Sequence, residues 1–227
     1  MEQEMAQHED ELWDRVFNRE NLKAALERVR QNRGAPGVDG MTVEELPEHL
    51  KKHWASIREK LETGKYRPSP VKRVEISKPG GGQRKLGIPT VLDRMIQQAL
   101  QQVLSEEFEG TFSEHSYGFR PGRSAQDAVE AAREYIEAGY QWTVDIDLEK
   151  FFDTVHHDRL MARMKARIAD KRVLRLVQLG VNMYPVVQPA AQLLKVLRPA
   201  CIIYYGLLLR NTSGSVGMRI SINGERQ

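Results

Sequence analysis

The sequence predicts an α+β fold in which helices dominate, with one short, basic β-hairpin whose turn is made of glycines. Two observations lead to this class. Apolar residues recur at helical spacing in five segments, residues 21–33, 46–63, 90–109, 124–138 and 158–178. Between them, runs rich in β-branched residues predict three strands, at residues 71–77, 84–88 and 142–146.

Length and charge limit the possible functions. The 227 residues suit one large domain or two small ones, and a hydrophobic fraction of 41% is enough for a core. The net charge is only +3, but beyond Asp158 basic residues outnumber acids twelve to two, whereas residues 1–158 hold 22 bases and 29 acids. Such local basicity favours a groove or fingertip over a uniformly basic binding protein.

Cysteine content and hydropathy point to a cytoplasmic, reducing setting. Cys201 is the only cysteine, so the chain can form no internal disulfide and no zinc site built on thiolates. The N-terminus is acidic and polar, unlike a signal peptide. Residues 186–209 are partly apolar, but polar residues and prolines interrupt them too often for a membrane span. We therefore expect no membrane partner.

The first third of the chain carries helix and turn signals. Residues 1–12 are charged and are expected to fray, and Gly34 is expected to end the helix at 21–33. Residues 35–40, Ala-Pro-Gly-Val-Asp-Gly, predict a rigid turn. Thr42 and Glu45 form a capping-box pattern before the next helix, although Pro47 can delay its start by a turn; Gly64 ends that helix.

The two strands at residues 71–77 and 84–88 flank a Pro-Gly-Gly-Gly turn and predict a basic hairpin. Residues 65–85 contain one acid, Glu75, and seven bases: Lys65, Arg67, Lys72, Arg73, Lys78, Arg84 and Lys85. Lys78 and Arg84 stand on either side of a glycine turn whose backbone can approach an anion. The alternative is a solvated edge hairpin that its charges protect from aggregation.

A second glycine-containing loop follows the long helix that Thr90 is expected to cap. In residues 116–124, Tyr117 and Phe119 offer stacking surfaces, and Arg120 and Arg123 offer phosphate partners. The alternative is an ordinary loop whose aromatic side chains tuck into the core. Ser124 is expected to cap the following helix and Gly139 to end it.

Two carboxylates follow on one predicted strand. Asp145 and Asp147 lie two residues apart, so their side chains are expected on the same face. Hard oxygen ligands of this kind suit Mg²⁺, which takes one or two protein carboxylates together with substrate phosphates.

The stretch from Asp147 to Asp153, Asp-Leu-Glu-Lys-Phe-Phe-Asp, resembles the first palm motif of group II intron-encoded reverse transcriptases. Pro-Gly-Val-Asp-Gly at 36–40 and the loop at 116–124 resemble earlier blocks of the same family. The resemblance covers roughly residues 13–177. It implies the fingers and part of the palm of a truncated right-hand polymerase. Residues 1–64 would form an N-terminal extension and the first fingers helices, and residues 65–138 the fingers with the basic hairpin and the template-side loop. Residues 139–177 would begin the palm with its first motif, and residues 178–227 would form an atypical tail, frameshifted or truncated.

The resemblance also implies roles for individual residues. Asp147, with the backbone carbonyl of Leu148, would ligate the metal, and Asp145 is the alternative. Lys78 and Arg84 would bind the nucleotide triphosphate. Phe152 would lie under the nucleotide sugar and Phe151 in the palm, or the reverse. The expected contacts with nucleic acid come from the hairpin and the loop, through Lys72, Arg73, Lys85, Tyr117, Phe119, Arg120 and Arg123.

The implied activity is RNA-directed DNA synthesis with Mg²⁺, using an RNA template, a DNA primer and dNTPs, together with maturase-type binding of intron RNA. The sequence departs from the family after residue 177. It contains no Asp-Asp pair and no Pro-Gln-Gly block, and residues 178–227 resemble a shifted reading frame or a truncated copy. Two alternatives follow: an RNA-binding fragment without polymerase activity, or a degenerate product that folds poorly.

Overall fold

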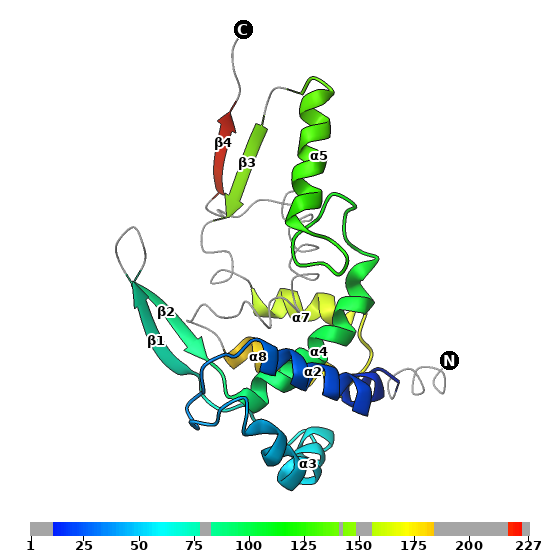
Figure 1. Cartoon of the computed structure of the whole chain (residues 1–227). Coiled ribbons are helices and arrows are strands. Elements are labelled where there is room, and N and C mark those ends of the chain that lie inside the picture. Colours follow the sequence, from blue (N-terminus) through cyan, green and yellow to red (C-terminus); the bar gives the residue numbers. More distant parts are fainter. Residues whose placement is uncertain (1–10, 78–82, 141–142, 149–155, 184–217, 224–227) are drawn as a thin grey trace, which may run out of the picture.

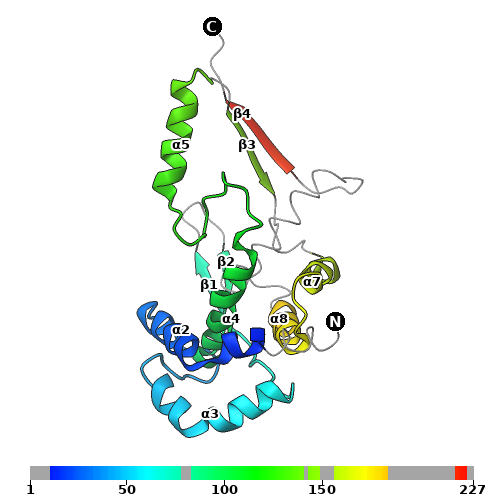
Figure 2. The same cartoon turned by 90° about the vertical axis from the view of Figure 1, so that its right-hand side faces the viewer.

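Helix α4, Val91–Glu109, runs through the middle of the fold (Figure 1). The computed structural model describes residues 11–77, 83–140, 143–148, 156–183 and 218–223. In the turned view of Figure 2, α2 (Arg19–Gln31) lies on one side of α4 and α3 (Leu46–Glu62) lies below it. α7 (His157–Lys165) and α8 (Lys171–Met183) lie on another. Helices and two small antiparallel sheets confirm the α+β class.

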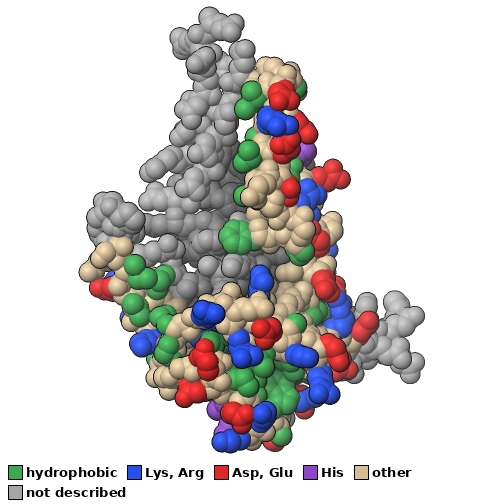
Figure 3. All heavy atoms as spheres, viewed as in Figure 1, with side chains coloured by type: hydrophobic (Ala, Val, Ile, Leu, Met, Phe, Trp, Pro, Cys, Tyr) green, Lys and Arg blue, Asp and Glu red, His purple; other side chains and the backbone are tan. Residues whose placement is uncertain are grey.

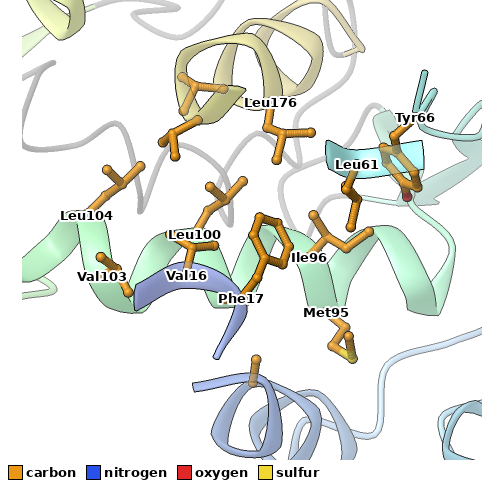
Figure 4. Packing of buried hydrophobic residues seen from close by; sticks show 14 of the residues in the cluster. Val16, Phe17, Leu61, Tyr66, Met95, Ile96, Leu100, Val103, Leu104 and Leu176 are labelled. Atoms are coloured by element: carbon orange, nitrogen blue, oxygen red, sulfur yellow. The ribbon is translucent and has the colours of Figure 1, made fainter. Parts of the chain in front are cut away.

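One hydrophobic core joins these helices. α4 buries an apolar stripe that includes Ile96, Leu100 and Leu104, each at most 3% exposed. Figure 4 shows Leu61 of α3 and Leu176 of α8 near that stripe. Burying a side chain of this size contributes roughly 1.5–3 kcal/mol, so α4 holds the body together mainly through this contact.

The N-terminal residues 11–17 form a helix, which corrects the expectation that the chain frays as far as residue 12. Trp13, Val16 and Phe17 are each at most 3% exposed and belong to the core. Their apolar spacing is helical, but charged neighbours conceal it. Residues 1–10 lie outside the described residues.

α2 begins and ends earlier than predicted. Asn18 caps it, because its side-chain oxygen accepts the backbone N–H of Asn21 at 2.7 Å. The expectation that Gly34 ends this helix is wrong, since Arg33 takes the left-handed conformation (φ 44°) after the cap residue Asn32. Gly34 instead leaves room for a neighbour: a Cβ there would lie 2.0 Å from an Arg94 guanidinium nitrogen.

α3 confirms the delayed start, because it begins at Leu46 with Pro47 in its first turn. Only the reverse half of the predicted capping box forms: the backbone N–H and hydroxyl of Thr42 donate to Glu45 at 2.8 and 3.0 Å. Gly64, at φ 65°, follows the end of this helix as predicted.

The single helix predicted at residues 158–178 is two helices, α7 and α8. The chain leaves α7 at Ala166, and Asp170 starts α8 by accepting the backbone N–H groups of Arg172 and Val173 at 2.8 and 3.2 Å. Asp170 is 2% exposed, and Arg172 forms a salt bridge with it. The prediction of a single helix is wrong because the apolar spacing continues across the break between α7 and α8. The acidic residue in that break, Asp170, is a capping residue.

The strands form two separate two-stranded sheets. β1 (Lys72–Ser77) pairs antiparallel with β2 (Gln83–Ile88), as predicted. β3 (Thr143–Leu148) runs two residues further than predicted and pairs antiparallel with β4 (Met218–Asn223). β4 comes from the tail, so the tail contributes a strand that the sequence did not suggest.

Ser124 caps α5 (Ala125–Glu137), and Gly139 follows its end at φ 94°, both as predicted. α5 has no buried residue, and Val129 and Ile136 are each 69% exposed. Figure 3 shows hydrophobic side chains along one edge of this helix. Among the described residues, no helix has the length and apolar character needed to cross a membrane.

A buried carboxylate ties the linker before the hairpin to the start of α4. Asp93, 2% exposed, accepts hydrogen bonds from the Tyr66 hydroxyl at 2.5 Å, from the Ser69 backbone N–H at 3.1 Å and from the Thr90 hydroxyl at 2.5 Å. These bonds fix the extended linker that leads into β1. Burial raises the pKa of the Asp93 carboxyl, and the hydrogen bonds from Thr90, Tyr66 and Ser69 oppose that rise.

The loop at residues 34–37 meets the same end of α4. Arg94 donates to the carbonyl oxygens of Gly34 and Ala35 at 3.3 and 2.8 Å. A Cβ at Gly37 would lie 2.7 Å from the Cα of Thr90, so only glycine permits this approach. The start of α4 is therefore the junction between the 34–37 loop and the base of the hairpin.

Asp93→Asn is expected to change how stability depends on pH. Because the pKa of Asp93 is raised in the folded chain, its contribution to stability is fully present below about pH 4, its unfolded value. That contribution is lost as the pH rises through the folded pKa. Urea unfolding of both proteins at several pH values measures this. The free-energy advantage of the unsubstituted chain over Asp93→Asn should shrink with rising pH, and an advantage that grows would contradict the buried, desolvated carboxyl.

Candidate nucleic-acid interface

The basic hairpin projects from the helical body (Figure 1). Its register pairs Arg73 with Gly87 and Glu75 with Lys85, so Arg73 and Lys85 flank Glu75 on one face. Lys72, opposite Ile88, belongs to the other face. Lys72, Arg73 and Lys85 are all exposed. The hairpin therefore presents cations on both faces, away from the core.

The turn of this hairpin carries the residues predicted to bind the triphosphate. Lys78 lies outside the described residues. Arg84 is in β2, opposite Ile76 and next to the turn. At the other end of the hairpin, Tyr66 and Ser69 of the preceding linker donate hydrogen bonds to the buried Asp93 carboxylate. The hairpin is thus anchored at its base.

The loop at residues 111–124 is organised by Arg120. Its guanidinium bonds the Glu109 carboxylate at 2.7 and 3.0 Å and the carbonyl oxygens of Ser113 and Ser116 at 2.6 and 2.9 Å. It also lies over the Phe112 ring, 5.0 Å from the centroid. The Arg120 side chain is only 9% exposed. These contacts make it the anchor of the loop; its predicted contact with nucleic acid stays a prediction.

The other predicted residues of the loop are more accessible. Arg123 lies 5.5 Å from the centroid of the Tyr117 ring and donates to the Glu114 carbonyl at 3.0 Å. Phe119 is 69% exposed, so the alternative in which it tucks into the core is wrong. Its backbone is in the left-handed region, at φ 59°, which costs on the order of 1–3 kcal/mol for a residue other than glycine. The loop thus holds an aromatic ring outward in a strained conformation.

The two candidate metal ligands lie on one strand. Asp145 and Asp147 occupy alternate positions of β3, and Leu148 is its last residue. In the register with β4, Asp145 is opposite Ser221 and Asp147 is opposite Arg219. Phe151 and Phe152 lie outside the described residues. The strand predicted to carry the carboxylates therefore exists and includes both.

The donor set fits a divalent cation in its chemistry. Two carboxylates two residues apart on a strand, with a backbone carbonyl beside them, are hard oxygen ligands. Among the side chains that the structure describes, no three His, Cys, Asp or Glu residues converge into a metal site. Those side chains do not include Asp145 and Asp147.

Sequence reasoning missed the residues that position the interface. No sequence pattern had assigned a role to Asp93, Tyr66 or Asp170. A signal existed for Asp93, because Thr90 and Asp93 have capping-box spacing. No local signal marks Tyr66, since its partner is 27 positions away.

Comparison with known proteins identifies the family. Residues 76–193 match the family described as reverse transcriptase (RNA-dependent DNA polymerase). The match takes in β2, the loop at 111–124 and β3 with its two aspartates. The chain belongs to the reverse transcriptase family, whose members use divalent metal ions.

Individual relatives refine this assignment. The chain is 37% identical over 162 residues to Protein YkfC of Escherichia coli, which covers 69% of this chain and 42% of that protein. It is 32% identical over 156 residues to the group II intron-encoded protein LtrA of Lactococcus lactis (67% of this chain, 25% of LtrA). It is 33% identical over 90 residues to nuclear intron maturase 1, mitochondrial, of Arabidopsis thaliana (40% of this chain, 12% of that protein).

The expected resemblance to group II intron reverse transcriptases and maturases is therefore confirmed. The match with the family runs to residue 193, beyond residue 177, where the resemblance was expected to end. The chain spans less than half the length of each of these relatives.

Arg120→Ala is expected to lower the free energy of unfolding by about 2 kcal/mol, because it leaves two carbonyls and a half-buried carboxylate without their donor. Arg133→Ala is the matched control: it removes an Arg with two Glu partners, Glu130 and Glu137, but its side chain is 60% exposed. That change should cost no more than about 0.5 kcal/mol. Urea unfolding measures both, and equal losses would contradict an anchoring role for Arg120.

Proposed function

We propose that this chain provides the fingers and the first palm strand of a group II intron reverse transcriptase, an RNA-directed DNA polymerase of right-hand architecture that also binds intron RNA. One observation supports this proposal more strongly than any other observation. Asp145 and Asp147 occupy alternate positions of a strand inside the segment that matches the family. A strand that carries such carboxylates is what metal-assisted phosphoryl transfer requires from a protein.

In this proposal Asp147 and the backbone carbonyl of Leu148 hold Mg²⁺, and Asp145 is the alternative ligand. The bound cation would supply activation of the primer hydroxyl and neutralisation of the leaving oxygen. The contribution of the protein is to hold the ligands on β3. β3 is paired along its whole length with β4, which restricts the positions that its residues can take.

Nucleotide binding is assigned to the turn of the hairpin and to the aromatic pair after β3. Lys78 and Arg84 would neutralise the triphosphate of a dNTP. Phe152 would lie beneath the sugar and Phe151 in the palm, or the reverse. The anchored base of the hairpin supports this assignment, because Tyr66 and Ser69 tie the linker into β1 to the buried Asp93.

Nucleic-acid binding is assigned to the hairpin strands and the loop at 111–124. Lys72, Arg73 and Lys85 would contact phosphates of an RNA template, a DNA primer or intron RNA. Tyr117, Phe119, Arg120 and Arg123 complete the surface. The names of LtrA, a group II intron-encoded protein, and of the Arabidopsis intron maturase support intron RNA as the partner.

Changing Lys72, Arg73 and Lys85 together to Ala is expected to weaken binding of single-stranded RNA about tenfold at moderate salt. It should also reduce the slope of log affinity against log salt by about 2, since each phosphate contact contributes about 0.7. Fluorescence anisotropy of labelled RNA across a salt series measures both quantities.

The matched control replaces three exposed lysines of α3, Lys51, Lys52 and Lys60, with Ala. It removes the same charge from a surface outside the proposed interface and should leave the salt slope nearly unchanged. If the two triple variants bind RNA alike, only net charge matters and the hairpin is not the contact surface.

Primer extension tests the catalytic part of the proposal. Because the 227 residues contain no Asp-Asp pair, the chain alone is expected not to extend a DNA primer on an RNA template with Mg²⁺ and dNTPs. Extension should appear only when the later palm segment of a relative is supplied as a second polypeptide, and Asp147→Ala should abolish it. Asp158→Ala, an exposed aspartate of α7, is the control. Extension by the chain alone that depends on Asp147 would show that the metal site is complete without a second strand.

A further inference from the structure

A cavity of about 330 Å³ lies between α2, α4 and the loop at 111–124. α2 contributes Arg28, α4 contributes Gln98, Gln101 and Ser105, and the loop contributes Phe119 and Arg120. Its volume is within the range of sites for small ligands, at the lower end. Of these residues, only Phe119 and Arg120 are predicted from the sequence to bind nucleic acid.

The aromatic ring of Phe119 lies at the rim of the cavity. Phe119 is 69% exposed, and its backbone is at φ 59°. Glycine adopts this left-handed conformation at less cost than phenylalanine does. The neighbouring Arg120 is fixed by Glu109, Ser113 and Ser116, so the backbone that carries the ring is anchored. An outward ring on a fixed, strained backbone is typical of a binding position.

The wall of the cavity is polar rather than apolar. Gln98 donates its side-chain N–H to Gln102 at 3.2 Å, and Gln102 donates to the Asn21 side chain at 2.5 Å. This chain of amides between α4 and α2 holds Gln98 in place. Gln101 and Ser105 are half-buried on the same helix. Arg28 of α2 is exposed and lines the cavity.

We propose that this cavity binds one unstacked base of a single-stranded RNA, with the base on the Phe119 ring. The base edge would bond the amides of Gln98 and Gln101, which carry both donors and acceptors, and Arg28 would contact a neighbouring phosphate. An apolar protein segment would leave these polar groups unsatisfied, so the lining favours a nucleobase. The site deepens the proposed function and rests on its RNA binding.

The experiment combines substitutions in the full chain with abasic sites in the RNA. Short single-stranded RNAs, each with one abasic position, are titrated against the unsubstituted chain and against Phe119→Ala by fluorescence anisotropy. Phe119→Ala should weaken binding of intact RNA about tenfold. One abasic position should weaken binding to the unsubstituted chain by a similar factor and have no further effect on Phe119→Ala, since both changes remove the same contact.

Three further variants separate binding from folding. Phe119→Gly removes the ring but relieves the left-handed backbone, so RNA binding should fall while the melting temperature stays or rises. Phe119→Tyr should restore binding. Tyr140→Ala removes an aromatic side chain that is 67% exposed outside the cavity, and it should bind RNA as the unsubstituted chain does.

The outcomes distinguish this site from the proposed function. If the unsubstituted chain binds RNA but Phe119→Ala binds it equally well, the base site is wrong and RNA binding stands. If the effects of Phe119→Ala and of every abasic position simply multiply, the ring does not stack on a base, and the site is again wrong. If the unsubstituted chain binds no RNA at all, the proposed function itself fails.

Discussion

The buried carboxylate of Asp93 is the interaction on which the arrangement of this chain depends most. A carboxylate placed in an apolar interior is unfavourable unless donors surround it. Here Thr90 lies on the same helix end, while Tyr66 and Ser69 come from the linker before the hairpin. Because the carboxylate needs these partners, it fixes where the linker crosses α4, and so sets the base from which β1 leaves the body.

In the candidate interface, some residues anchor the backbone and others expose side chains to solvent. Arg120 satisfies two carbonyls and a carboxylate, and it is nearly buried. Phe119, its neighbour in sequence, is exposed on the backbone that Arg120 anchors. The hairpin repeats this division, with buried contacts at its base and exposed cations along its strands. A family that binds nucleic acid needs such rigid supports, because flexible cations and rings lose more conformational entropy on binding.

Much of the local structure could be predicted because its signals are local. The cap at Thr90, the cap at Ser124 and the antiparallel pairing of β1 with β2 each depend on residues close together in the sequence, and all three agree with the structure. The single helix at 158–178 failed for the opposite reason. Apolar periodicity continues through the break, and α7 and α8 pack in the same core, so nothing in the apolar pattern shows that Asp170 is a cap between two helices.

Motifs and periodicity are properties of neighbouring residues. They were therefore enough to predict the family, the order of most elements and the strand that carries Asp145 and Asp147. The pairing of β4 of the tail with β3 and the hydrogen bond from Tyr66 to Asp93 could not be predicted and are seen only in the folded chain. The fold also requires Gly37 for space beside the backbone of Thr90 rather than for a turn. These depend on contacts between distant segments, and no local pattern records which segments the burial of one apolar core will bring together.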